Sequence, residues 1–219
     1  MDSRFSQVVT RSVQAMSIKY NTMVYELQRQ GKKVIVMSLG EAFFDIPLFD
    51  MKELPNPKIF HYSHSRGIPE LREKLAEYFI LNYDIPINYE KEILITSGSK
   101  AAIHFALMSI LNPGDEVILP SYTFSSTANA VVLRGAKPVF CEVTPDTMNI
   151  DVNLIEPLVT ERTKMILPID YAGIPCEIDE IMKVAEKHDL IVMQDAAQSF
   201  HSLHKDGKPC GAVPELAAF

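Results

Sequence analysis

The sequence predicts an α/β fold with three layers, in which a mostly parallel sheet lies between two layers of helices. From residue 92 onward, short apolar segments alternate with helical segments. Strands that alternate with helices of about ten or more residues form parallel sheets through right-handed crossovers. Residues 190–193 are an unbroken apolar run, which is typical of a strand buried on both faces of such a sheet.

The N-terminal third is organised differently. Apolar side chains recur every three or four positions over residues 8–30, which predicts an amphipathic helix followed by a strand at 34–37. Another helix is expected over 69–83, with Pro69 in its first turn. We therefore expect an N-terminal helical arm or small-domain segment at 1–35 and a large domain at 36–219.

The remaining elements follow from the alternation beyond residue 92. The expected strands are 92–96, 116–119, 138–143, 164–169 and 190–194, and the expected helices are 99–111, 124–134, about 152–159 and 177–188.

The composition of the chain limits the classes of function that it can have. The 219 residues are 47% hydrophobic and 22% charged, as in a globular protein, and the net charge of −7 argues against nucleic-acid or anionic-membrane partners. No apolar run approaches the roughly 20 residues of a membrane span, and the N-terminus does not resemble a signal peptide, so we expect a cytoplasmic protein. Its three widely spaced cysteines fit reduced thiols. The paired histidines at 61/64 and 201/204 lack a third ligand, so no metal site is predicted.

Asp195 follows the buried strand 190–194 directly and precedes two alanines. Ligands of parallel sheets bind beyond the carboxyl ends of the strands. A carboxylate there is poorly hydrated and needs a cationic or N–H partner. Alternatively, Asp195 is a helix N-cap without a ligand.

Two further segments follow strands. In Thr96-Ser97-Gly98-Ser99, Gly98 permits a sharp turn and Ser99 can cap the next helix, whose first N–H groups would bind an anion. Gly and Ser also occur at such junctions for backbone reasons alone, and Lys100 is expected to be a solvated charge. Phe124, after strand 116–119, either lies flat against a planar ligand or belongs to the core.

An anion site, an aromatic wall and a buried carboxylate on one sheet edge are what pyridoxal phosphate (PLP) needs. No glycine-rich dinucleotide or P-loop motif follows any expected strand. If the three segments meet at one edge of the sheet, the combination therefore predicts PLP as the cofactor.

The motifs resemble two groups of fold-type-I PLP-dependent aminotransferases. Residues from about 116 to 219 resemble the DegT/DnrJ sugar-nucleotide aminotransferases, especially those acting on dTDP-4-keto-6-deoxyhexoses, and residues from about 8 to 119 resemble class I aminotransferases. The matching stretches are 120–124, 135–140, 145–151 and 195–198 for the first group, and 36–41, 62–72, 96–100 and 112–118 for the second. The resemblance implies the large domain of a fold-type-I PLP transferase.

The resemblance also implies roles for individual residues. Asp195 would bind the pyridine nitrogen of PLP, with Gln198 beside the ring. Phe124 would stack on the ring, and Gly98 with Ser99 would hold the phosphate.

Two weaker assignments come from the class I half. Gly40 would line the substrate side, and Tyr62 would reach the cofactor phosphate of a neighbouring subunit in a homodimer. The chain stops at Phe219, before the stretch that carries the Schiff-base lysine in the sugar aminotransferases, so no catalytic residue is assigned and the large domain is expected to be incomplete at its C-terminus. Lys205 and Lys208 match no catalytic position.

Several functions remain open from the sequence. The first is the N-terminal portion of an aminotransferase of polysaccharide biosynthesis, which moves an amino group from a donor such as glutamate to a keto sugar nucleotide. The others are a PLP- or nucleotide-sugar-binding module without the lysine, and a half-enzyme completed by a second chain. An amino acid/2-oxo acid substrate is the alternative, but the class I loop Asn-Pro-x-Asn-Pro-Thr-Gly is replaced by residues 168–173.

Overall fold

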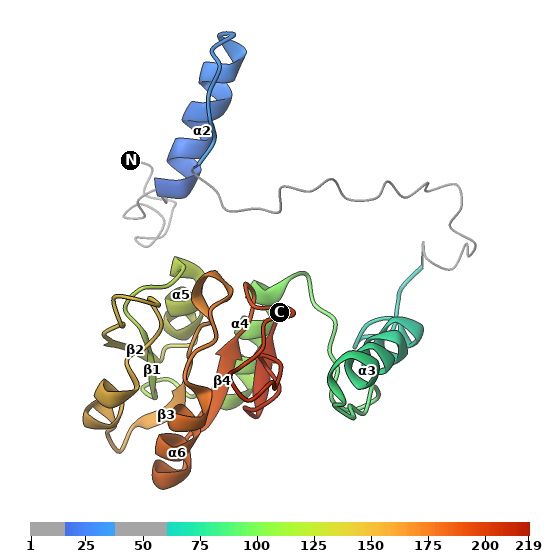
Figure 1. The fold of residues 1–219 in the computed structure, drawn as a ribbon, viewed down its shortest axis with the longest axis vertical. Coiled ribbons are helices and arrows are strands. Elements are labelled where there is room, and N and C mark those ends of the chain that lie inside the picture. The colour runs from blue at the N-terminus through green and yellow to red at the C-terminus, as the bar shows by residue number, and fades with distance from the viewer. Residues whose placement is uncertain (1–15, 38–60) are drawn as a thin grey trace, which may run out of the picture. The chain divides into compact units, whose positions relative to one another are not determined.

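The computed structural model describes residues 16–37 and 61–219, and the chain divides into two compact units, Met1–Pro57 and Lys58–Phe219 (Figure 1). In the first unit, helix α2 (Met16–Arg29) confirms the described part of the expected helix 8–30. The expectation of a strand at 34–37 is wrong, because these residues form no strand. Ile35 and Met37 are about 90% exposed, and a strand needs a paired neighbour that the described residues do not supply. The domain boundary after residue 35 stays a prediction.

The second unit contains a five-stranded sheet with the order β2-β1-β3-β4-β5, in which every pair of neighbours is parallel. The α/β fold class predicted from the sequence is therefore confirmed. The strands are β1 (Glu116–Pro120), β2 (Lys137–Cys141), β3 (Thr163–Ile166), β4 (Ile191–Asp195) and β5 (Leu216–Ala218).

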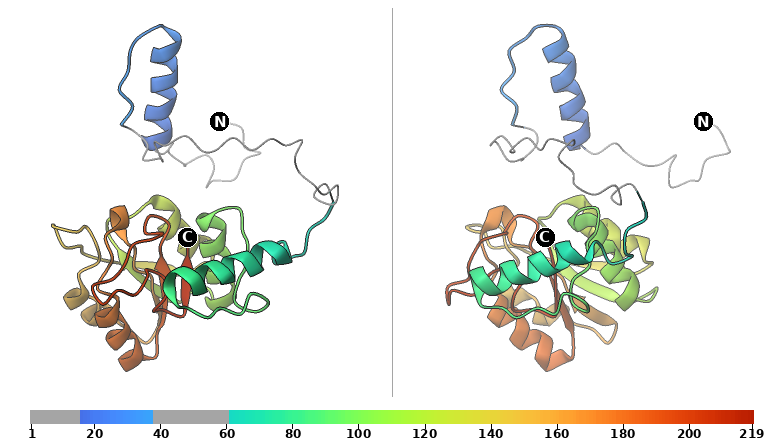
Figure 2. Two further views of the ribbon diagram at one scale, coloured as in Figure 1. Left: turned by 45° about the vertical axis from the view of Figure 1, so that its right-hand side comes forward. Right: turned by 90° about the vertical axis from the view of Figure 1, so that its right-hand side faces the viewer.

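Helices cover both faces of this sheet (Figures 1 and 2). Neighbouring residues of a strand point to opposite faces, and β1 shows the consequence. Val117 packs in the cluster that includes Leu107 of α4 (Ser99–Ile110) and Val131 of α5 (Ser125–Leu133). Ile118 packs in the other cluster, with Ile181 of α6 (Ile178–His188). Burial on both faces explains why the central strands are apolar throughout.

The order of the strands creates a crevice at one edge. The chain leaves β1 through α5 toward β2, whereas it leaves β3 through α6 toward β4, on the other side of the sheet. Adjacent parallel strands whose outgoing connections diverge leave a gap outside their carboxyl ends, where ligands of open α/β sheets bind. The topology therefore places a candidate site beyond β1 and β3.

Two sequence-based expectations about the elements are corrected, and one strand was missed. Residues 152–159 form two short 3-10 helices, η3 (Val152–Leu154) and η4 (Glu156–Leu158), because Pro157 has no N–H to continue an α-helix. Residues 92–96 form no strand, although the N–H of Ile95 donates to the carbonyl oxygen of Arg66 at 3.0 Å. Strand β5 was not expected, since three residues are too few to show a periodic pattern.

Helix α3 (Pro69–Tyr83) confirms the expected helix 69–83, including Pro69 in its first turn. It contacts the C-terminal part of the chain through aromatic side chains. The ring of Tyr78 stacks on that of Phe200 at 5.9 Å, and Phe79 lies 6.1 Å from Phe219. Among the helices of the described residues, none combines the length and the apolar character that crossing a membrane requires.

Candidate cofactor site

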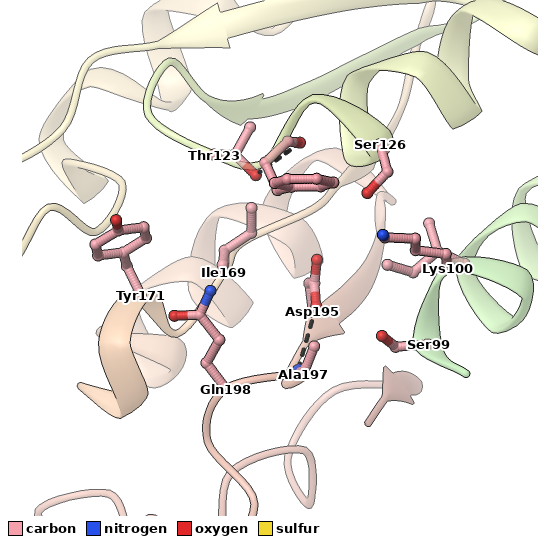
Figure 3. A pocket seen from close by; sticks show the side chains of 11 residues that line it. Ser99, Lys100, Thr123, Ser126, Ile169, Tyr171, Asp195, Ala197 and Gln198 are labelled. Atoms are coloured by element: carbon pink, nitrogen blue, oxygen red, sulfur yellow. Dashed lines mark hydrogen bonds between the residues drawn. The ribbon is translucent and has the colours of Figure 1, made fainter. Parts of the chain in front are cut away.

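A cavity of about 230 Å³ lies at the carboxyl ends of β1, β3 and β4. Three turns supply its walls, one after each of these strands, and the N-terminus of α4 closes one end. Figure 3 shows the Asp195 carboxylate between Ser99 and Lys100 on one side and Gln198 on the other. This is the crevice expected from the divergence of the strand connections.

Asp195 is the last residue of β4 and is only 8% exposed. One carboxylate oxygen accepts a hydrogen bond from the Ala197 N–H at 3.2 Å, and the other accepts from the Thr127 hydroxyl at 3.3 Å. Both are longer than the 2.7–2.9 Å or so of strong charge-assisted bonds. Burial raises the pKa of the Asp195 carboxyl, these two bonds lower it, and the nearby charge of Asp170 raises it again. The carboxylate is thus buried, weakly partnered and suited to a cationic N–H group from a ligand.

Phe124 supplies an aromatic surface on the same cavity. It is the N-cap of α5 in an extended conformation and is half-exposed. The ammonium nitrogen of Lys100 lies 4.7 Å from the centre of its ring, a cation–π arrangement. Lys100, expected from the sequence to be a solvated charge, therefore lines the cavity beside the ring.

The N-terminus of α4 provides the anion-binding end. Gly98 is the N-cap, with φ of 86° and ψ of 166°, a conformation accessible essentially to glycine alone. The expectation that Ser99 caps the helix is wrong, since Ser99 is the first helical residue and its side chain lines the cavity instead. The first N–H groups of a helix lack intrahelical acceptors and lie at the positive end of its dipole. This end of the cavity therefore suits a phosphate.

Gln198 joins two of the turns that form the cavity. Its amide oxygen accepts a hydrogen bond from the Ala172 N–H at 2.7 Å, which links the turn after β4 to the turn after β3. Tyr171, next to Ala172, lines the cavity, and its hydroxyl donates to that of Tyr122 at 3.3 Å. With its oxygen engaged, Gln198 presents its NH₂ group as a donor.

The structure brings most of the candidate residues together. Ser99, Phe124, Asp195 and Gln198 line one cavity, and Gly98 adjoins it. Tyr62 is fully exposed and is not among the lining residues. The roles of all these residues stay predictions.

The remaining candidates are one residue that the structure does not describe and two lysines that do not line the cavity. Gly40 lies outside the described residues. Lys205 and Lys208 belong to a loop closed by the pairing of Leu203 with Pro209, where Lys208 forms an ion pair with Asp206 at 2.8 Å.

Sequence reasoning did not single out the polar residues that surround Asp195. Thr127 is buried, lies one helical turn after Phe124 and binds the carboxylate. The sequence did contain an indication of this role. Thr127 lies three residues after the aromatic residue at a strand–helix junction, and residues three apart lie on one face of a helix. Asp170 and Ser199 were also missed, and they hydrogen-bond to each other in the interior behind the cavity.

The side chains around the cavity fit PLP. A buried, weakly bonded carboxylate matches a protonated pyridine nitrogen, a half-exposed aromatic ring matches its planar face, and a helix N-terminus matches its phosphate. These three features lie on the walls of one cavity.

The sheet and its helices are those of the large domain of fold-type-I PLP-dependent aminotransferases. The aspartate aminotransferase of Thermus thermophilus with maleate superimposes on 87% of this chain and 52% of its own, with a TM-score of 0.73 and 29% sequence identity. This similarity includes the part of the chain that precedes the parallel sheet.

The profile of the DegT/DnrJ/EryC1/StrS aminotransferase family matches residues 86–219. The chain therefore belongs to this family of PLP-dependent sugar aminotransferases. The match begins earlier than residue 116, where the sequence motifs had placed the start of the resemblance.

Two relatives illustrate the similarity. The chain is 46% identical over 116 residues to the UDP-4-amino-4-deoxy-L-arabinose–oxoglutarate aminotransferase of Shewanella sediminis, which covers 52% of this chain and 30% of the relative. It is 36% identical over 158 residues to the GDP-perosamine synthase of Caulobacter vibrioides, covering 72% and 40%, respectively. The chain thus spans well under half the length of the curated relatives it matches.

Proposed function

We propose that the whole protein is a PLP-dependent aminotransferase that transfers an amino group to a keto sugar nucleotide, and that this chain contributes the cofactor-binding part of its large domain. The observation that carries the proposal is the buried Asp195 carboxylate, which opens on the same cavity as Phe124 and Ser99. Burying a carboxylate that makes only two long internal hydrogen bonds costs stability, and the binding of a ligand is the best reason for keeping it there.

In this proposal each part of the cavity has one task. The Asp195 carboxylate accepts a hydrogen bond from the protonated pyridine nitrogen and so keeps the ring positively charged. Phe124 packs against the ring, and the N–H groups that follow Gly98 bind the phosphate, together with the Ser99 hydroxyl. The NH₂ group of Gln198 binds beside the ring. When bound, PLP supplies an electron sink for breaking bonds to the substrate's amino-bearing carbon.

The substrate class rests on the relatives. The names of both curated relatives refer to sugar nucleotides or their products, and that of the Shewanella protein names oxoglutarate as the second reactant. We therefore propose a keto sugar nucleotide as the acceptor, an amino donor such as glutamate, and a role in polysaccharide biosynthesis. An amino acid/2-oxo acid pair is the less favoured alternative, although the fold extends to an aspartate aminotransferase.

The assembly is also a proposal. We propose a cytoplasmic homodimer in which Tyr62 of one subunit contacts the cofactor phosphate of the other, and Gly40 lines the substrate side. The fully exposed side chain of Tyr62 is compatible with such a contact.

The cofactor site is tested by titrating this chain with PLP and following the absorbance of the bound cofactor and the quenching of tyrosine fluorescence. We expect saturable binding to the wild type and strongly weakened binding to Asp195→Ala. Asp206→Ala serves as the control, since Asp206 is an acid paired with Lys208 outside the cavity, and it should bind PLP like the wild type. No saturable binding to the wild type would refute the site.

The activity is tested with the full-length protein. Amino transfer from glutamate should be faster to a keto sugar nucleotide than to a 2-oxo acid, measured as the 2-oxoglutarate formed with each acceptor. The reverse preference would overturn the proposed substrate class while leaving the cofactor site intact.

A further inference from the structure

Behind the candidate site lies a second carboxylate that does not line the cavity. Asp170 is completely buried, and its carboxylate accepts three hydrogen bonds. One oxygen accepts from the Cys176 N–H at 2.9 Å, and the other accepts at 2.7 Å from both the Gln194 amide and the Ser199 hydroxyl. A buried carboxylate with a full set of donors holds those donors firmly, because breaking any one bond exposes a charge to an apolar interior.

Two of the three donors flank the segment that carries Asp195 and Gln198. Gln194 immediately precedes Asp195 in β4, and Ser199 immediately follows Gln198. Asp170 itself begins the turn whose Ala172 N–H binds Gln198. Its own N–H donates to the Asp195 carbonyl oxygen at 3.3 Å. One carboxylate thus connects the turn after β3 with both ends of the segment that carries Asp195 and Gln198.

The direction of each hydrogen bond in this network is fixed. The Gln194 amide oxygen accepts from the Gly211 N–H at 2.8 Å, so its NH₂ group must point toward Asp170. If the Gln194 amide were turned over, its NH₂ group would face the Gly211 N–H, and two donors would meet. Position 170 must therefore provide acceptors on both sides, toward Gln194 and toward the Cys176 N–H, which a carboxylate does and an amide, with its single oxygen, does not.

We propose that Asp170 is a positioning residue of the cofactor site, because its buried carboxylate ties together the two turns that aim Asp195 and Gln198 into the cavity. This inference rests on the PLP site proposed above. Asp170 acts through Gln194, Ser199 and the backbone, and it makes no contact with the cofactor in this proposal.

The network suggests a compensating pair of substitutions. In Asp170→Asn, the new NH₂ group must face either the NH₂ group of Gln194 or the N–H of Cys176, so a hydrogen bond is lost in either orientation. In the double variant Asp170→Asn/Gln194→Glu, Asn donates to Glu, and the other Glu oxygen still accepts from Gly211. The double variant therefore restores the pattern of donors and acceptors and keeps one negative charge within the network, moved from position 170 to position 194.

A matched control lies at the opposite end of the sheet. Glu116 begins β1, is 1% exposed and binds three donors, at 2.7 Å from Thr160, 2.8 Å from Arg162 and 3.0 Å from Lys137. It resembles Asp170 in burial and bonding but is remote from the cavity. Glu116→Gln should lower stability without affecting the site.

Two measurements on the folded chain test the proposal. The first is the Kd for PLP, and the second is the hydrogen exchange of the Ala172 and Ala197 amides without cofactor. We expect Asp170→Asn to raise the Kd roughly tenfold or more and to accelerate exchange at both amides. The double variant should return both values to within about threefold of the wild type, and Glu116→Gln should leave both unchanged.

The outcomes separate this inference from the proposed function. If the wild type does not bind PLP, the proposed cofactor site fails, but faster exchange at Ala172 and Ala197 in Asp170→Asn still supports the positioning role. Unchanged exchange in that variant would overturn the role, whatever happens to PLP. Failure of the double variant to restore either measurement would overturn the network of directed hydrogen bonds.

Discussion

Replacing Asp195 with Asn should stabilise the protein without cofactor and weaken its binding of PLP. The carboxylate is 8% exposed, and burial is the main reason for its raised pKa. Asn retains both internal hydrogen bonds. Its oxygen can accept from the Ala197 N–H, and its NH₂ group can donate to the Thr127 hydroxyl, whose own hydrogen can then turn to the Thr123 hydroxyl at 3.4 Å. The substitution therefore removes a buried charge without leaving a polar group unpaired.

The size of both effects follows from this geometry. Relief of the desolvation of one buried, weakly bonded carboxylate should increase the free energy of unfolding by roughly 1 kcal/mol. In a protein of this size that corresponds to about 2–4 °C in Tm. The charge-assisted hydrogen bond to the pyridine nitrogen contributes about 1.5–3 kcal/mol, so its loss should raise the Kd for PLP roughly 10- to 150-fold.

The effect on stability has a distinctive pH dependence. In the unfolded chain the Asp195 carboxyl titrates near its ordinary pKa of 3.8, whereas in the folded protein its pKa is higher. Below pH 3.8 both states are protonated, and wild type and Asp195→Asn should be similarly stable. As the pH rises through the raised pKa, the wild type loses stability relative to the variant, and the difference is constant above it.

Urea unfolding without PLP, followed by circular dichroism, measures this difference. The series should run from about pH 3.5, close to the pKa of an aspartate in an unfolded chain, to about pH 8. PLP titration at about pH 7, where an ordinary aspartate is ionised, measures the second effect. An Asn variant that is less stable than the wild type at neutral pH, or a difference that does not vary with pH, would refute the argument from burial. Unchanged PLP affinity would refute the contact with the pyridine nitrogen.

Three further predictions concern other parts of the fold. Gly98→Ala should lower the free energy of unfolding by about 1–3 kcal/mol because φ there is 86°, and it should also weaken PLP binding. Gly114, at φ of 95°, has equal space for a methyl group, so Gly114→Ala should affect stability alone. The hydrogen bond from Thr160 and the bond from Lys137 lower the pKa of Glu116 below its usual 4.5, so its stabilisation is present above pH 4.5 and is lost as pH falls; Glu116→Gln should therefore flatten the acid side of the urea-unfolding profile. Leu107→Ala should lower the unfolding free energy by about 2–5 kcal/mol because Leu107 is completely buried, and Leu133→Ala, at a side chain that is 75% exposed, should change it by less than about 0.5 kcal/mol in calorimetry.

The elements that could be predicted are those whose burial can be inferred from the residues next to them in the sequence. The apolar runs of β1 and β4 indicate strands covered on both faces, and α6 has its buried residues Ile178, Ile181 and Ala185 at helical spacing. The elements that failed depend on a partner. Residues 92–96 have the composition of a strand, but composition does not supply a neighbouring strand with which to form a ladder.

The candidate site shows the same division. The sequence by itself determined that an acid ends a buried strand, that a glycine-bearing turn begins a helix and that an aromatic residue follows another strand, because each of these is a local feature of the chain. Only the tertiary structure decided that Thr127 binds a carboxylate 68 positions away, and that Asp170 holds Gln194 across 24 positions. These contacts depend on the order of the strands and on which turns meet at the crevice, and the local sequence does not specify either.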